Sequence, residues 1–150
     1  MLRAAAQHDG PVYIRLSTDT NERPHATDGR LLRLRTGTRA AVIAVGPLLD
    51  PVLRATADLD VTVAYATTVR PFDTEGLVAL GHTDIVLVEP YLAGTSARVV
   101  ADALRQVPHR VLSLGVGRAD LHRYGDPMDH AAWHGLDAAG LRKSIAEFTW

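Results

Sequence analysis

The sequence predicts an α/β fold in which helices cover both faces of a mostly parallel sheet. Two observations support this fold class. The predicted strands are continuous apolar runs rather than alternations of apolar and polar residues, as expected of strands buried on both faces. Segments with helical spacing separate these runs, so strands and helices alternate along the chain. The 150 residues, of which 47% are hydrophobic, suffice for one well-packed core.

The elements of this core follow in a regular order. The predicted strands are residues 40–45, 61–65, 84–88 and 110–114. The predicted helices are residues 46–58, 73–80, 96–106 and 137–148. Pro47 falls in the first turn of the first helix, where its missing N–H costs no helical hydrogen bond. Asp73 and Asp137 are suited to cap the second and the last helix. Together these elements predict a Rossmann-like three-layer sandwich.

The remaining parts of the chain are less regular. Residues 2–8 have the character of a helix end, and residues 12–16 have that of a buried strand. Residues 17–30 are rich in polar and turn-forming residues, which indicates a linker. Residues 30–35 alternate between basic and apolar side chains and predict a short, half-exposed strand. We expect residues 115–133 to be irregular.

The composition excludes several classes of protein. The formal net charge of −1 gives no basic field for nucleic acid or an anionic membrane. With no cysteine, the chain has no disulfide, thiolate zinc site or cysteine nucleophile. Its apolar runs are shorter than the roughly 20 residues of a transmembrane helix. Polar residues 7–9 interrupt any signal-peptide core, so we expect a cytoplasmic protein.

Short sequence blocks carry a family resemblance. The blocks are residues 10–16 (GPVYIRL), 41–47 (AVIAVGP), 69–73 (VRPFD), 85–89 (IVLVE) and 135–141 (GLDAAGL). Each block is weak alone, but their order and spacing extend over nearly the whole chain. The chain thus resembles the C-terminal domain of the thiamine-diphosphate-dependent transketolase superfamily. That superfamily includes transketolases, deoxyxylulose-phosphate synthases and the E1β chains of 2-oxoacid dehydrogenases.

The resemblance implies a domain organisation. Residues 1–17 would be the last helix and strand of a pyrimidine-binding domain, residues 18–35 a linker, and residues 36–150 the transketolase C-terminal-like domain. In the family, the cofactor lies between the pyrophosphate-binding and pyrimidine-binding domains, and the C-terminal domain supports the dimer without performing chemistry. The family's activating glutamate lies upstream of the retained helix and strand, and no residue here matches it. The resemblance therefore implies no catalytic, cofactor-binding or metal residue in this chain. Thiamine diphosphate and magnesium would belong to the assembled complex.

Two departures from the family pattern concern specificity. Related transketolases often carry a phosphate-contacting arginine at the position of Thr18, and a threonine cannot replace its bidentate charged contact. The frequent Glu-Glu-His after the third strand is Glu89-Pro90-Tyr91 here. Drift in a noncatalytic region and a changed substrate are both compatible with these differences.

Two further groups of residues suggest local chemistry. His130 and His134 have the spacing of zinc ligands on a helix, but a polar interface loop explains them better. Residues 94–96 can offer free N–H groups to an anion at a helix start, and ordinary capping explains them equally well.

We therefore expect a noncatalytic C-terminal subunit of a split transketolase-like enzyme that transfers two-carbon ketol units. Its partner would be the subunit with the N-terminal and pyrimidine domains, in a homodimer or heterotetramer of the complex. A strand that belongs to a neighbour's sheet leaves backbone groups unpaired, which favours association. The residues that could line the substrate channel are Arg15, Ser17, Thr18 and Asp19. The alternatives are a self-standing α/β binding or regulatory module and a truncated gene product.

Overall fold

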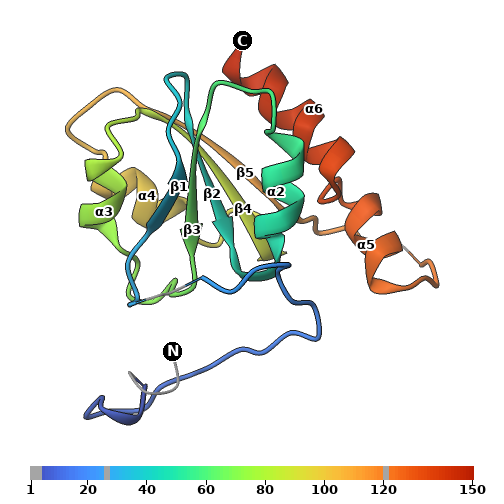
Figure 1. Ribbon diagram of the computed structural model, residues 1–150, viewed down its shortest axis with the longest axis horizontal. Coiled ribbons are helices and arrows are strands. Elements are labelled where there is room, and N and C mark those ends of the chain that lie inside the picture. Colours follow the sequence, from blue (N-terminus) through green and yellow to red (C-terminus); the bar gives the residue numbers. More distant parts are fainter. Residues whose placement is uncertain (1–4, 26–27, 120–121) are drawn as a thin grey trace.

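The computed structural model describes residues 5–25, 28–119 and 122–150. Its sheet has five strands in the order β1-β3-β2-β4-β5. The strands are β1 (Leu32–Arg35), β2 (Ala41–Val45), β3 (Thr62–Ala66), β4 (Asp84–Leu92) and β5 (Arg110–Val116). The helices are η1 (Gly46–Leu48), α2 (Leu49–Ala55), α3 (Thr74–Ala79), α4 (Ala97–Ala103), α5 (Pro127–Trp133) and α6 (Ala138–Thr149). Figure 1 shows the sheet between two groups of helices, which confirms the predicted α/β sandwich.

The sheet is parallel except at one edge. β2 pairs with β3 and β4 in parallel, and β4 pairs with β5 in parallel. β1 pairs antiparallel with β3, with Leu32 opposite Tyr65. The short strand expected within residues 30–35 is therefore present, and the sheet includes the last four residues of the segment assigned to the linker. The parallel strands of such a sheet end together at one edge, where α/β proteins place their sites.

Both faces of the sheet are buried, which explains the continuous apolar strands. Along β2, Val42 and Ala44 belong to one core, whereas Ile43 and Val45 belong to the other. The first core lies under α2 and α6 and includes Leu49, Val52, Leu141 and Ile145. The second lies under α3 and α4 and includes Leu77 and Val100. Every residue of β2 is thus needed for packing on one side or the other.

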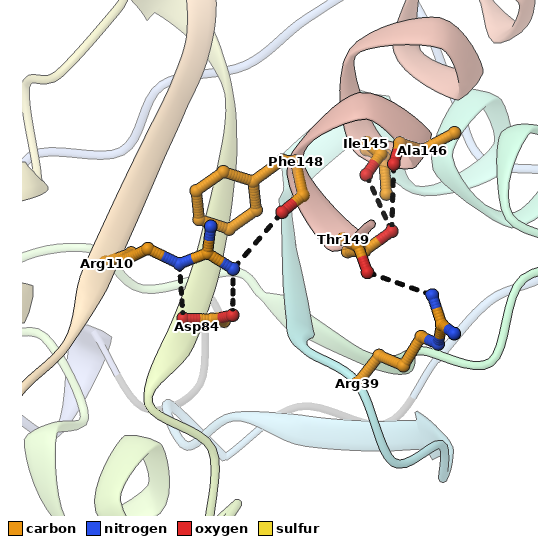
Figure 2. Close-up of polar contacts among 7 residues, drawn as sticks. All are labelled: Arg39, Asp84, Arg110, Ile145, Ala146, Phe148 and Thr149. Atoms are coloured by element: carbon orange, nitrogen blue, oxygen red, sulfur yellow. Dashed lines mark hydrogen bonds and ion pairs between the residues drawn. The ribbon is translucent and has the colours of Figure 1, made fainter.

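Helix α6 is fastened at the amino end of the sheet, as Figure 2 shows. Arg110 donates to both Asp84 carboxylate oxygens and to the Phe148 carbonyl, the latter at 3.3 Å. Arg39 donates to the Thr149 carbonyl at 3.0 Å. The hydrogen bond from Arg110 lowers the pKa of Asp84 below its usual value. The contacts at this end therefore join the last helix to the strand starts.

The structure corrects one prediction, does not test a second and leaves a third partly outside its range. Residues 115–133 are not irregular throughout, because residues 127–133 form α5 under a complete capping box between Asp126 and Asp129. Residues 12–16 do not form a strand within this chain and are largely exposed. Of the helix end expected at residues 2–8, Ala5 and Ala6 are helical, and residues 2–4 lie outside the described residues.

None of the helices that the structure describes combines the length and the apolar character needed to cross a membrane.

Candidate functional site

The predicted channel residues lie on the N-terminal arm, which we define as residues 5–20. The arm extends away from the domain, on the lower side of Figure 1. Asp19 donates its backbone N–H to Oγ of Ser17 at 3.1 Å, so these two residues form a turn. The Arg15 guanidinium lies 6.0 Å from the centroid of the Tyr91 ring. Arg15, Ser17, Thr18 and Asp19 are all exposed, and the structure does not enclose them in a channel.

Asn21 fixes the point at which the arm leaves the domain. Its Nδ2 donates to the Gly46 carbonyl at 3.3 Å and to Oη of Tyr65 at 3.0 Å. Gly46 follows β2, and Tyr65 is near the end of β3, so this contact lies at the carboxyl end of the parallel strands. Burial raises the pKa of Tyr65, against the opposing effect of the hydrogen bond from Asn21. The phenol is therefore neutral, and its oxygen accepts the hydrogen bond from the Asn21 amide.

Further contacts hold Glu22 and His25 against the same end of the sheet. The N–H of Glu22 donates to Oδ2 of Asp50, and the carboxylate of Glu22 accepts from Arg54 at 2.9 Å. The His25 ring meets the Tyr65 ring edge-on, with 5.7 Å between centroids. Asp50 and Arg54 belong to α2, so α2 and β3 together position the chain that precedes β1.

A buried polar cluster lies at the end of β4. Glu89 is 0% exposed, and its Oε1 accepts the Ser96 N–H at 3.1 Å. Within this cluster, Oε2 of Glu89, Oη of Tyr91 and Oγ of Ser96 are buried and make no hydrogen bond of ordinary geometry. Burial raises the pKa of Tyr91, and the Glu89 charge acts in the same direction. The end of β4 thus carries a buried polar cluster beside the Tyr91 ring that Arg15 approaches.

The N–H groups of residues 95–97, at the helix start considered as an anion site, make hydrogen bonds within the chain. Thr95 donates its N–H to the Leu92 carbonyl at 3.2 Å, and Ala97 donates to the Gly94 carbonyl at 3.1 Å. The Ser96 N–H is taken by Glu89. Contacts within the chain therefore engage these three N–H groups, although Ser96, the N-cap residue of α4, makes no side-chain capping hydrogen bond.

His130 lies within α5 and His134 directly follows it, and the two side chains make different contacts. The His130 ring packs edge-on against Trp133, with 4.7 Å between centroids. Nδ1 of His134 accepts the Gly117 N–H at 3.2 Å, which ties the end of α5 to the end of β5. Within residues 5–25, 28–119 and 122–150, no three His, Asp or Glu side chains gather as metal ligands would.

The sequence did not point to Asn21 or Tyr65. Asn21 and Tyr65 are brought together over a separation of 44 residues, which no local pattern records. Glu89 and Tyr91 did stand out, because Glu89-Pro90-Tyr91 takes the place of the family's frequent Glu-Glu-His.

Known proteins resemble this chain over parts of their length. An uncharacterised 33.6 kDa protein in the fasciation locus of Rhodococcoides fascians is 54% identical over 147 residues, which cover 93% of this chain and 47% of the relative. The 1-deoxy-D-xylulose-5-phosphate synthase of Acidovorax sp. (strain JS42) is 40% identical over 75% of this chain and 19% of its own length. That of Thiobacillus denitrificans is 34% identical over 98% of this chain and 26% of its own length. The chain thus spans less than half the length of these relatives.

A solved structure agrees with the sequence matches. The structure described as a split gene transketolase, inactive beta4 tetramer, has a TM-score of 0.77 and 22% identity over 99% of this chain and 53% of that chain. No family model matches the chain. The shared sheet and the matches to deoxyxylulose-phosphate synthases define an α/β module of the transketolase type. In sequence and in fold the chain is similar to a transketolase C-terminal domain.

Proposed function

We propose that this chain is the noncatalytic C-terminal subunit of a split, thiamine-diphosphate-dependent, transketolase-like enzyme. The enzyme would transfer two-carbon ketol units, and the chain would contribute to assembly and dimer formation in the cytoplasm. The subunits that carry the pyrophosphate-binding and pyrimidine-binding domains would perform the chemistry. The family relationship and the exposed N-terminal arm together support this proposal.

The main observation behind this proposal is the set of exposed apolar side chains on the N-terminal arm. Tyr13 is 88% exposed, Leu16 is 79% exposed and Val12 is 46% exposed, on a segment that forms neither helix nor strand. An extended apolar segment with free backbone groups is suited to add a strand to another sheet. Residues 12–16 would complete the sheet of the pyrimidine-binding domain, and residues 17–19 would then be brought to the substrate channel.

The described residues do not fit thiamine diphosphate or its magnesium. They contain no carboxylate and histidine cluster suited to a metal. At the first strand–helix turn, Pro47 has no N–H to donate and the Gly46 carbonyl already accepts from Asn21. The N–H groups of Thr95, Ser96 and Ala97, at the start of α4, are engaged within the chain. The proposal therefore assigns no cofactor ligand and no chemical step to this chain.

A binding experiment tests the proposal. The chain is coexpressed with the part of the 33.6 kDa R. fascians relative that it does not match, and the products are weighed by native mass spectrometry. We expect a stoichiometric complex, and we expect the double variant Tyr13→Ser/Leu16→Ser to lose it. Val107→Ser is the matched control, since Val107 is also apolar and exposed but lies before β5, outside the arm. A wild-type chain that remains alone and monodisperse would contradict the proposal.

A further inference from the structure

The segment that precedes the last helix projects a second apolar surface. We call residues 122–133 the α5 knob. Tyr124 is fully exposed and Met128 is 80% exposed, and none of the residues of α5 itself is buried. The described core therefore gives no reason for large apolar side chains at these two positions.

The α5 knob is held in shape by its own contacts. Asp126 accepts from the Asp129 N–H at 2.9 Å, and Asp129 accepts from the Asp126 N–H at 3.2 Å. The Arg123 guanidinium lies 5.6 Å from the centroid of the Trp133 ring. A Cβ at Gly125 would lie 2.6 Å from the same ring, so glycine allows the chain to pass close to Trp133. Tyr124 and Met128 are thus presented on a preorganised segment, which lowers the ordering cost of binding.

The α5 knob and the N-terminal arm emerge from the same end of the sheet. Asn21 anchors the arm to the turn after β2, and His134 ties the end of α5 to Gly117, just after β5. In Figure 1 the arm lies below the domain and α5 lies on its right side. β2 and β5 are separated by β4 alone, so their ends lie about 10 Å apart at ordinary strand spacing.

The length of the arm limits where its partner can lie. Leu16 precedes the Asn21 anchor by five residues, which extend to about 17 Å at most. A protein body that takes up residues 12–16 in its sheet must therefore lie over the carboxyl end of β2. A domain of about 30 Å in diameter at that place also faces the α5 knob.

The relatives indicate which protein region takes up residues 12–16 in its sheet. The chain matches 47% of the R. fascians protein and 53% of the split transketolase chain, so each carries a further region of about the same size. We propose that the α5 knob docks on the body formed by that further region, the same body that takes up residues 12–16. Tyrosine, tryptophan, methionine and arginine, which the knob contains, are the side chains enriched in protein interfaces. This inference rests on the proposed function.

The double variant Tyr124→Ser/Met128→Ser tests the inference. Its affinity for the unmatched part of the R. fascians relative is measured by isothermal titration calorimetry beside the wild-type chain. We expect the dissociation constant to rise about tenfold or more, as for the loss of central interface residues. Val107→Ser, on the other side of the domain, is expected to bind like the wild type. Circular dichroism and thermal unfolding establish that each variant is folded.

The outcomes separate this inference from the proposed function. If the arm variant loses binding but the α5 knob variant binds like the wild type, the proposed function stands and the inference is wrong. If the wild-type chain itself does not bind, both are refuted. Weaker binding by both variants, with the control unchanged, supports both.

Discussion

Asp73 is expected to be the most consequential single carboxylate for stability. Its Oδ1 accepts the Gly76 N–H at 2.9 Å and caps α3, and its Oδ2 accepts the Leu31 N–H at 2.8 Å. One side chain thus fastens both the start of α3 and the chain that enters β1. Replacement by alanine removes an N-cap and a second, charge-assisted hydrogen bond, which we expect to cost about 2–4 kcal/mol of unfolding free energy.

The loss of stability in Asp73→Ala should depend on pH. Burial alone raises the pKa of Asp73, but the hydrogen bonds from Leu31 and Gly76 outweigh it, and the net pKa lies below the usual 3.8. A lowered pKa in the folded state adds stability above the unfolded-state pKa, and that stability is lost as the pH falls through the folded-state pKa. The difference in unfolding free energy between wild type and Asp73→Ala should therefore be largest at neutral pH and should decrease below about pH 4.

Urea denaturation at neutral and acidic pH measures both quantities. Asp102→Ala serves as the control, because Asp102 makes only an exposed ion pair with Arg98 at 3.8 Å and should change stability little. Equal unfolding free energies for wild type and Asp73→Ala at neutral pH would refute the double role of this carboxylate. A loss that persists undiminished at acidic pH would refute the electrostatic part of the argument.

Two other substitutions separate global from local stability. Gly115→Ala would place a Cβ 2.6 Å from the Tyr91 carbonyl and 2.8 Å from Cα of Ala93, so we expect a loss of about 1–3 kcal/mol, seen as a lower midpoint of thermal unfolding. An unchanged midpoint would contradict this prediction, because it would mean that the end of β4 can move away from β5 without loss of stability. Asp126→Ala removes the capping box of a helix without buried residues, so amide protection in α5 should fall while the global unfolding free energy changes by less than about 0.5 kcal/mol. A large global loss would mean that α5 supports the core.

The sequence was sufficient for the sheet core because both faces of each central strand are buried. Residues 41–45 alternate between two cores, so every position must be apolar and the run is easy to recognise. The caps of α3 and α6 were also predictable, because Asp73 and Asp137 act on residues three positions later.

Helix α5 escaped prediction because its residues bury no continuous face. A helical period in apolar residues arises only when one side packs against a core, and none of the residues of α5 is buried. The remaining signal was the acidic pair Asp126 and Asp129 on either side of Pro127, which forms the observed capping box.

The residues of the candidate site could be predicted from the sequence only in part, for a different reason. Arg15, Ser17, Thr18 and Asp19 were chosen by resemblance, and their assignment to a channel stays a prediction. The contact of Asn21 with Tyr65 joins distant parts of the chain and depends on the whole sheet. Residues 12–16 have the composition of a strand, but a strand also needs a neighbour, and the described chain provides none for them.

Hydrogen–deuterium exchange at residues 12–16 tests the central claim most directly. It is measured on the chain alone and after addition of the unmatched part of the R. fascians relative. Our account predicts rapid exchange in the lone chain and strong protection in the mixture, because added strands gain backbone hydrogen bonds. Rapid exchange at these residues in a complex that has nevertheless formed would contradict the role of the arm as a strand for its partner.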